Sequence, residues 1–533
     1  MNKEGSMFCL SSASQFLRGL RGLTLSTVAG TMMVIVACTV GPDYIRPTAE
    51  SPGSFKELEG WKRAQPKEDA IRGAWWDLFN DPQLNALEEK VDISNQNLVA
   101  AEAQFRQARA LVQEARSSYF PVASVLGSYA RSRRSANLTG SAAASSATVN
   151  SNYLMEGDIS WELDVWGRVR RAVEANRAGA QASAADLEAV RLSAQAELAQ
   201  NYFLLRAVDA QKKLLDETII SFQKSLDLTK NRYESGVASK GDVVVAETQV
   251  KTTQAQSIDL GVQRSQLEHA IATLIGTPAS LFSIPVTPLT DAPPDIPIGV
   301  PSELLERRPD IAAAERRVAA ANAQIGVAQA AFYPTVTLSA SGGFQATDLS
   351  KWLSWPSRFW SFGPAISELL FDGGLRRAQT DEARAAHDAS VALYRQTVLT
   401  GFQEVEDNLA ALRVLEEEAK VQDEAVKAAE QSVTVTTNQY KAGIVNYLGV
   451  VTVQVIALNN SKTAVNILGN RLSAAVLLIK ALGGGWNASG LPTDRDLAGK
   501  DANPPRSTET KAVPALPTSP TVIGAQQESN TMK

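Results

Sequence analysis

The chain has 533 residues, a formal net charge of -5 at pH 7 and only 20% charged residues. Because it lacks the positive footprint that neutralises phosphates, we expect no nucleic-acid partner. Its two cysteines, Cys9 and Cys38, lie near the start, which excludes a disulfide or a cysteine-based metal cluster from the rest of the chain. His269 and His387 each lie in helical sequence rich in Ala and charge, so we expect no metal, no cofactor and no acid–base site.

Residues 1–37 are typical of an export signal. Lys3, Arg18 and Arg21 precede "LTLSTVAGTMMVIVA", an apolar stretch too short for a membrane-spanning helix. The run ends in "IVAC", which has the apolar-apolar-small-Cys form of a bacterial lipobox. The segment 1–37 is therefore predicted to be removed as a lipoprotein signal peptide.

Cys38 is predicted to become the first residue of the mature protein and to carry a diacylglycerol. The alternative is a chance cysteine that closes a simple secretory signal. Thr39 follows Cys38, and the absence of an Asp there argues against retention at the inner membrane. Residues 38–83 would then form an N-terminal lipidated segment.

A comparison of the chain with itself indicates a tandem duplication. "NLVAAEAQFRQARALVQEARSSYFPVASVLGS" from Asn97 resembles "DIAAAERRVAAANAQIGVAQAAFYPTVTLSAS" from Asp310. "LDVWGRVRRA" from Leu163 matches "LLFDGGLRRA" from Leu369, and "SLDLTKNRYESGVASKGDVVVAETQV" matches "SVTVTTNQYKAGIVNYLGVVTVQVIA". The blocks recur in the same order at nearly one spacing. We expect two equivalent repeats, at 84–295 and 301–485, followed by a Pro-, Ser- and Thr-rich tail at 486–533 that is predicted to be disordered.

Each repeat is predicted to contain a helix, two strands, a very long helix, a turn and a returning helix. In the first repeat the long helix at about 168–232 has an Ala-rich, heptad-like apolar seam and would span roughly 97 Å at 1.5 Å per residue. The shorter helices, 84–119 and 242–275, together match its length, so they can stack end to end along it. The second repeat predicts the same arrangement from helices at 301–332, 374–440 and 447–480.

Four segments show the period-two pattern of strands with one apolar and one hydrophilic face. They lie at about 121–131, 153–165, 334–345 and 360–371. Such a sheet could bury its apolar face against helices in a soluble protein. The aromatic residues around the strands are instead typical of the girdles of outer-membrane barrels, which favours a membrane barrel with a polar, water-lined interior.

Four strands are too few to close a barrel, and an open sheet edge cannot lie in lipid. We therefore expect an oligomer, with three copies giving twelve strands. Four acidic residues of one strand would face the lumen of that barrel, either as a hydrated wall or as groups that give a mild cation preference. They are Glu156, Asp158, Glu162 and Asp164.

The blocks "CTVGPDYIRP", "WWDLFNDPQLNALEEK", "ELDVWGRVRRA", "LLERRPDIAAAERRVAAANAQIGVAQAAFYP" and "ELLFDGGLRRAQ" resemble the outer-membrane factors of the TolC and OprM type. The resemblance is to the NodT-like lipoprotein subgroup and covers about residues 38–485. It implies a mixed α/β membrane protein, a homotrimer whose 12-stranded outer-membrane barrel continues into a periplasmic α-helical barrel. It also implies a passive exit duct that docks a periplasmic membrane-fusion adaptor and an inner-membrane pump of the resistance-nodulation-division (RND) class.

The resemblance places the gate of the duct at two periplasmic hairpins, "RYESGVASKGDV" and "QYKAGIVNYLGV". Gly236 and Gly443 occupy matching positions, either as turn residues with positive φ or as helix C-caps. By resemblance Tyr440 matches a gate tyrosine and Asp242 its acidic hydrogen-bond partner. The expected tip residues are Tyr233, Gly236, Asp242, Tyr440, Gly443, Val445, Tyr447 and Leu448.

The tip also departs from the TolC pattern. Val445 replaces an arginine of that pattern, and Gly449 and Thr452 replace a pair of aspartates. We therefore expect a tip closed by apolar packing around Val445, Tyr447 and Leu448, with only weak block by multivalent cations.

Two other functions are compatible with parts of this pattern. The same fold serves as the outer-membrane component of type I protein secretion, although the lipobox and the "GPDY" start argue against it. A lipid-anchored coiled-coil scaffold without a pore would not need alternating strands. The sequence shows no ordered phosphate loop, nucleophile elbow or metal-spaced ligands, so we expect no enzyme.

Overall fold

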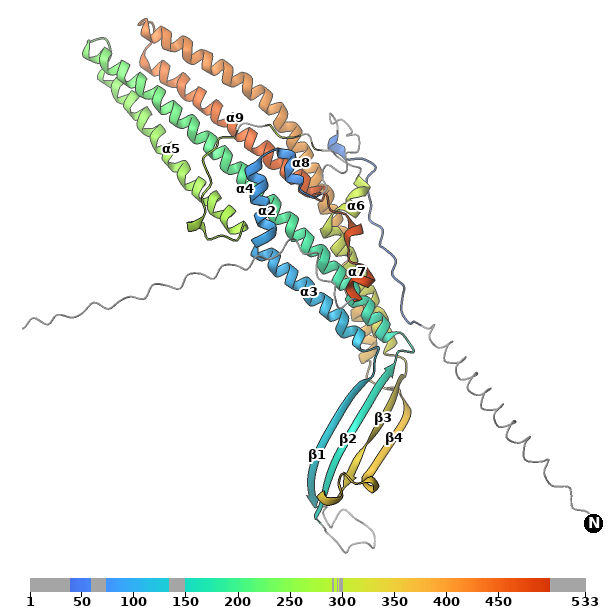
Figure 1. Ribbon diagram of the computed structural model, residues 1–533. Helices are drawn as coiled ribbons and strands as arrows, with labels where there is room; N and C mark the ends of the chain where they lie inside the picture. Colours follow the sequence, from blue (N-terminus) through green and yellow to red (C-terminus); the bar gives the residue numbers. More distant parts are fainter. Residues whose placement is uncertain are drawn as a thin grey trace, which may run out of the picture.

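The computed structural model describes residues 39–58, 73–133, 149–289, 292–294, 296 and 301–498. Within these residues a long helical body carries a β-sheet at one end and two helical hairpins at the other (Figure 1). The predicted signal peptide and Cys38 lie outside the described residues.

The two longest helices have equal lengths, as the predicted duplication requires. Helices α4 (Arg168–Glu234) and α8 (Leu375–Lys441) have 67 residues each, and each extends for about 100 Å at 1.5 Å per residue. Each leads through a short turn into a returning helix of 35 residues, α5 (Lys240–Leu274) or α9 (Tyr447–Ala481). Helix α9 is long and apolar enough to cross a membrane, but half of its most apolar window is buried in the helical body.

The predicted single helix at 84–119 is wrong, because the chain turns at Asn95. Helix α2 (Pro82–Ser94) ends there and α3 (Gln96–Ser117) begins. The Asn95 side-chain oxygen accepts from the backbone N–H groups of Asn97 and Leu98, and its amide donates to the Leu274 carbonyl at 2.7 Å. The buried Asn95 therefore joins the start of α3 to the end of α5, as end-to-end stacking requires.

The second repeat makes the same junction with a different residue. The helix predicted from 301 is divided into a short 3₁₀ turn, α6 (Leu304–Arg307) and α7 (Pro309–Ala330). Arg308 lies at the break, and its Nη1 donates to the carbonyl of Ala481, the last residue of α9, at 3.2 Å. Pro309 suits the first turn of α7, where no N–H partner is lost.

The main hydrophobic core lies where the repeats meet in the helical body. Trp75 from the 3₁₀ helix Trp75–Phe79, Tyr202 from α4 and Tyr394 from α8 are each 1% exposed. The N-terminal segment lies along the outside of this body. Its Phe55 is buried in the core, and the backbone N–H groups of Lys56 and Glu57 donate to the Glu406 carboxylate on α8.

The structure corrects the predicted start of the disordered tail. Residues up to 498 pack back on the helices, ending in α10 (Asp494–Ala498). Leu497 is 1% exposed and packs with Val112 of α3 and Ala180 of α4, while Arg177 pairs with Asp494 at 2.9 Å. The Pro-rich part of the predicted tail, from 499, lies outside the described residues.

Four antiparallel strands form one sheet in the order β1-β2-β3-β4. They are β1 (Val122–Arg133), β2 (Val149–Leu163), β3 (Thr335–Ala346) and β4 (Arg358–Ser367). The register puts Val125 and Ile159 on one face and Ser124 and Asp158 on the other. We call the first the apolar sheet face. The sheet projects beyond the helices (Figure 1), and apolar side chains such as Val125 (77% exposed) and Phe362 (66%) lie open, so the alternative of a sheet packed on helices is excluded.

The sheet has two open edges in a single chain. Strands β1 and β4 each pair on one side only, and they run in opposite directions because every neighbouring pair is antiparallel. Backbone groups on an open edge have no partners in a hydrocarbon environment. Each edge therefore needs a strand from another chain.

Candidate functional site

The two hairpin tips are built by the same local motif. In the first, Gly236 has φ +73°, its N–H donates to the Tyr233 carbonyl and the N–H of Val237 donates to Arg232. In the second, Gly443 has φ +79°, with equivalent bonds from Gly443 to Tyr440 and from Ile444 to Gln439. This is the Schellman motif, which needs a left-handed residue after the helix. Both suggestions for these glycines are thus confirmed, since they end the long helices and begin the turns.

A compact apolar cluster holds the two hairpins of one chain together. We call it the tip cluster, and its rings Tyr440 and Tyr447 are 5% and 2% exposed, with centroids 5.4 Å apart in an edge-on arrangement. Val445 packs against it and is half-buried, whereas Leu448 is 60% exposed and lies outside it. The buried members are Phe222, Leu226, Ala246, Val250, Tyr440, Tyr447 and Val450.

The expected hydrogen bond between Asp242 and Tyr440 is not formed. Asp242 instead completes a capping box at the start of α5, where its carboxylate accepts from the N–H and hydroxyl of Ser239 at 3.0 Å each. The Tyr440 hydroxyl lies 3.4 Å from Thr229 Oγ1 on α4. The difference has a local cause: Asp242 follows Ser239 by three positions, which is the spacing of a capping box.

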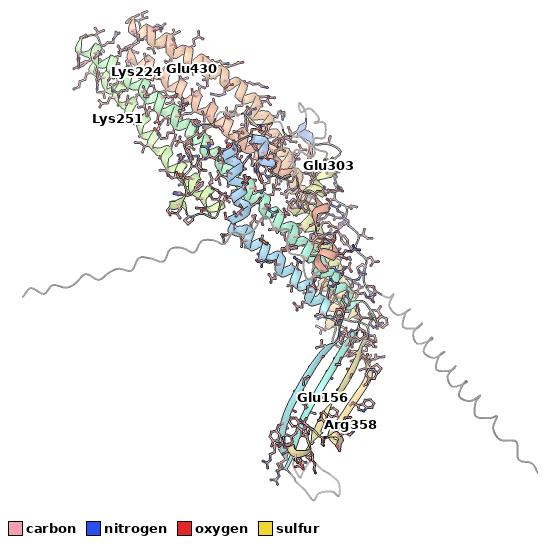
Figure 2. All side chains as sticks on the ribbon, in the orientation of Figure 1. Glu156, Lys224, Lys251, Glu303, Arg358 and Glu430 are labelled. Atoms are coloured by element: carbon pink, nitrogen blue, oxygen red, sulfur yellow. The ribbon has the colours of Figure 1, made fainter. Side chains whose placement is uncertain are left out.

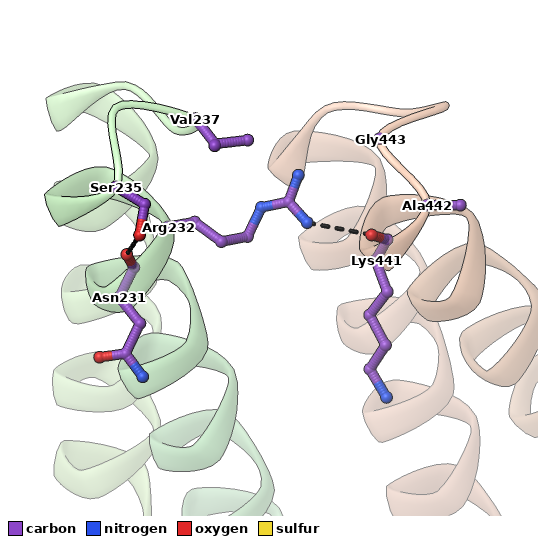
Figure 3. Close-up of a pocket in the computed structure, with 7 residues that line it drawn as sticks. All are labelled: Asn231, Arg232, Ser235, Val237, Lys441, Ala442 and Gly443. Carbon is purple, nitrogen blue, oxygen red and sulfur yellow. Dashed lines mark hydrogen bonds between the residues drawn. The ribbon is translucent and has the colours of Figure 1, made fainter.

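Arg232 connects the two tips, and the resemblance had not indicated it. Its guanidinium lies 4.7 Å from the Tyr440 ring centroid, and its Nη1 donates to the Lys441 carbonyl at 3.2 Å. Figure 3 shows this side chain reaching from the end of α4 across to the end of α8. In the repeat alignment Arg232 corresponds to Gln439, and this difference between the two tips was the available signal.

The space between the tips is an open cleft of about 470 Å³. It is lined by Asn231, Arg232, Ser235, Val237, Lys441, Ala442 and Gly443. Tyr233, at the end of α4, is 46% exposed and is not part of the lining. The cleft is therefore lined by the ends and turns of the two hairpins, and the Arg232 guanidinium bridges them.

Burial in the tip cluster changes the acidity of Tyr447. Burial first, and then the nearby Tyr440 and Asp242, raise the pKa of Tyr447 to about 12. Its phenol is consequently neutral at physiological pH. In the second tip Asn446 caps α9 by accepting from the N–H of Gly449. Gly449 lies at the position where the first tip has Asp242.

Of the four predicted lumen acids, two have structural partners at the junction of sheet and helix. Glu162 accepts from Arg168 at 2.6 and 3.0 Å. Asp164 accepts from the backbone N–H groups of Val169 and Arg170 at 2.9 Å each, so it caps the first turn of α4 rather than serving as a free wall charge. Asp372 does the same for α8 by accepting from Gly374 and Arg376.

Glu156 and Asp158 keep the predicted position on the polar face of the sheet. They pair in register with Gly343 and Ser341, and Figure 2 labels Glu156 on the sheet. Of the four acids predicted to face the lumen, two per chain therefore remain as candidates for free charges on the polar face.

A sheet with one exposed apolar face and two open edges, joined to a helical body, defines one part of an outer-membrane channel. The outer membrane efflux protein family model matches residues 88–277 and 300–484. The chain is 31% identical over 467 residues to TtgC of Pseudomonas putida, named a probable efflux pump outer membrane protein, and the match covers 87% of this chain and 96% of TtgC. The solved structure of the outer-membrane channel OprN is 31% identical with a TM-score of 0.77, and the match covers 84% of this chain and 100% of OprN.

OprJ of Pseudomonas aeruginosa, an outer membrane protein, is likewise 31% identical over 459 residues, which cover 85% of this chain and 94% of OprJ. The chain therefore belongs to the outer membrane efflux protein family. It is an outer-membrane efflux channel, and the fold class expected from the sequence is confirmed. Channels of this kind are not an enzyme class.

Proposed function

We propose that three copies of this chain form the passive exit duct of a tripartite RND-type efflux system. The observation that carries the proposal is the four-stranded sheet with its exposed apolar face and two open edges. Three copies supply twelve strands, and pairing β4 of one copy with β1 of the next removes every edge. The long helices continue from the same strands, so closing the barrel would place six long helices around one axis.

We propose further that Cys38 is acylated and lies in the inner leaflet of the outer membrane. Its neighbour Thr39 lies against Gly167, the residue that precedes α4 just after strand β2. The N–H of Val40 also donates to the Trp166 carbonyl at 3.0 Å. These contacts fix the start of the described chain at the junction of sheet and helices, which is where a lipid anchor of the inner leaflet would need to be.

The partners proposed for the tips are a periplasmic membrane-fusion adaptor and, through it, an inner-membrane RND pump. The tips are suited to a partner because each ends in a short exposed turn, and the contacts between them are a small apolar cluster and a few polar bonds such as that of Arg232. A closure that depends on a few kcal/mol can be shifted by a partner that binds the open form better.

The experiment is a pair of measurements on the full chain. Purified protein in planar bilayers should give discrete channels and should run as a trimer, whereas a scaffold without a pore would give no conductance. In cells, deletion should raise sensitivity to small toxic compounds and leave protein export unchanged. A selective loss of one exported protein would instead support the alternative, the outer-membrane component of type I secretion.

A further inference from the structure

The charged residues of the apolar sheet face are confined to one end of the sheet. By register this face holds alternate residues of all four strands, and its charged members are Arg131 and Arg133 on β1 and Arg358 on β4. All three are exposed, and none of the other residues on this face is charged. A charge on a lipid-facing strand costs about 2–4 kcal/mol at the bilayer midplane and little near the interface.

The three arginines lie at the end of the sheet that is remote from the helices. Strand β1 leaves α3 at Val122 and ends at Arg133, and β4 begins at Arg358 and returns toward α8. Figure 2 shows Arg358 at this remote end. Because the helical body extends into the periplasm, the remote end is the extracellular one.

A layer of aromatic side chains lies next to these arginines at the remote end of the sheet. The rings of Tyr129 and Tyr153 have centroids 4.7 Å apart, and Tyr153 lies 5.8 Å from Trp352. The Arg358 guanidinium stacks 3.9 Å from the Trp355 ring centroid. Aromatic girdles mark the level of the headgroups in outer-membrane barrels. The arginines therefore lie at the headgroup layer, and stacking holds one of them in a fixed orientation.

We propose that this arginine end of the apolar sheet face binds the phosphate groups of phosphorylated glycolipids in the outer leaflet. Guanidinium groups bind phosphate bidentately through parallel N–H donors. The β3–β4 connection that precedes Arg358 contains one acid, Asp348. Asp348 pairs with Lys351 at 3.9 Å, so it does not cancel the arginine charge.

The proposed trimer would strengthen this site, and to that extent the inference rests on the proposed function. Pairing β4 of one copy with β1 of the next would bring Arg358 to the same seam as Arg131 and Arg133 of its neighbour. The outer leaflet would then meet three such seams. The size of the assembly is measured separately from lipid binding, so failure of the trimer and failure of the lipid site are distinguishable.

The test uses the purified full-length trimer and three probes: diphosphoryl lipid A, the same lipid without its phosphates, and inorganic phosphate. Native mass spectrometry would measure the bound lipid. We expect diphosphoryl lipid A to bind at least about tenfold more tightly than the dephosphorylated lipid, with inorganic phosphate failing to displace it. Equal binding of the two lipids, or displacement by inorganic phosphate at similar concentration, would overturn the proposal.

The matching variant is Arg131→Gln/Arg133→Gln/Arg358→Gln, which should lose on the order of tenfold in affinity for diphosphoryl lipid A while remaining a conducting trimer. The control, Arg106→Gln/Arg377→Gln/Arg384→Gln, removes as many exposed arginines from the helices and should leave lipid binding unchanged. If the first variant keeps wild-type affinity, the proposal is wrong. If it does not assemble, the wild-type comparison of the two lipids still decides.

Discussion

The Arg232 guanidinium lies 4.7 Å from the centre of the Tyr440 ring, so a cation at the end of α4 rests on an aromatic ring at the end of α8. These residues belong to different repeats and are separated by more than two hundred positions in the sequence. Beside them Arg232 donates to Lys441, and Tyr440 meets Thr229. Arg232 and Tyr440 thus tie the two hairpins of one chain together, alongside a hydrogen bond from Gln454 of α9 to Ser225 of α4 at 3.3 Å.

Arg232→Ala should make the closed tip easier to open. It removes a cation–π contact and a hydrogen bond, each worth about 1 kcal/mol at a partly exposed site. In planar bilayers the variant should spend more time in high-conductance states than the wild type. Lys230→Ala, a cation nearby on the same helix, is the matched control and should behave as wild type. Unchanged gating in Arg232→Ala would show that the tip cluster alone keeps the hairpins together.

A double-mutant cycle distinguishes the observed partner of Tyr440 from the expected one. Arg232→Ala and Tyr440→Leu should be coupled, because each removes one side of the same contact. Asp242→Ala should instead lose about 1 kcal/mol from the α5 cap and should add independently to Tyr440→Leu. Hydrogen exchange of the tip amides would measure the coupling energy of each pair of substitutions. Strong coupling between Asp242 and Tyr440 would mean that the capping box gives way to a hydrogen bond between them.

Replacing a turn glycine and replacing a helix glycine by alanine should change the stability in opposite directions. Gly236→Ala and Gly443→Ala force a side chain into positive φ and should each destabilise the tip by about 1 kcal/mol. Gly261 lies within helix α5 with open space around its Cα, so Gly261→Ala should stabilise the helix slightly. Thermal unfolding would measure the difference. Equal effects at all three sites would contradict the left-handed geometry at the turns.

Glu88 predicts a pH-dependent stability. It is fully buried in α2, neither carboxylate oxygen has a hydrogen-bond partner among the described residues, and burial followed by Asp92 raises its pKa well above 4.5. The folded state therefore favours the proton, and the stability present below pH 4.5 is lost as the pH rises toward the raised pKa.

Glu88→Gln should accordingly flatten the fall of the thermal midpoint between pH 4.5 and neutral pH. Its exposed neighbour offers the control, since Glu89→Gln should leave the profile unchanged. Identical profiles for wild type and Glu88→Gln would show that the carboxyl has a partner when three chains assemble.

Cys38→Ala, with a signal that is still processed, should give channel-forming trimers in reduced number. The barrel itself holds the protein in lipid, so acylation would add only an auxiliary anchor. Outer-membrane fractionation and conductance would measure both quantities. Complete loss of trimers would show that the acyl chains are essential for assembly.

The sequence by itself determined the duplication, the long helices, the two faces of the sheet and the turn glycines. These features depend on local periodicity and backbone preference, and each is repeated a second time in the chain. Tyr440 and Tyr447 were identified differently, because the resemblance to the TolC-type family pointed to the hairpin in which they lie. The helix breaks at Asn95 and Arg308 were missed, since they become visible only when their side chains meet the distant ends of α5 and α9.

The tertiary structure alone decided which polar groups from distant parts of the chain meet. Asp242, which the resemblance made the partner of Tyr440, and Asp164, which was predicted to face the lumen, instead accept from backbone N–H groups close by in the sequence. The sequence shows that Arg232 differs from its counterpart Gln439, but the partners of Arg232 appear only when the second repeat brings Tyr440 and Lys441 beside it. A hydrogen bond is specified by a few tenths of an ångström between atoms, and sequence spacing fixes that distance only within one turn of one element.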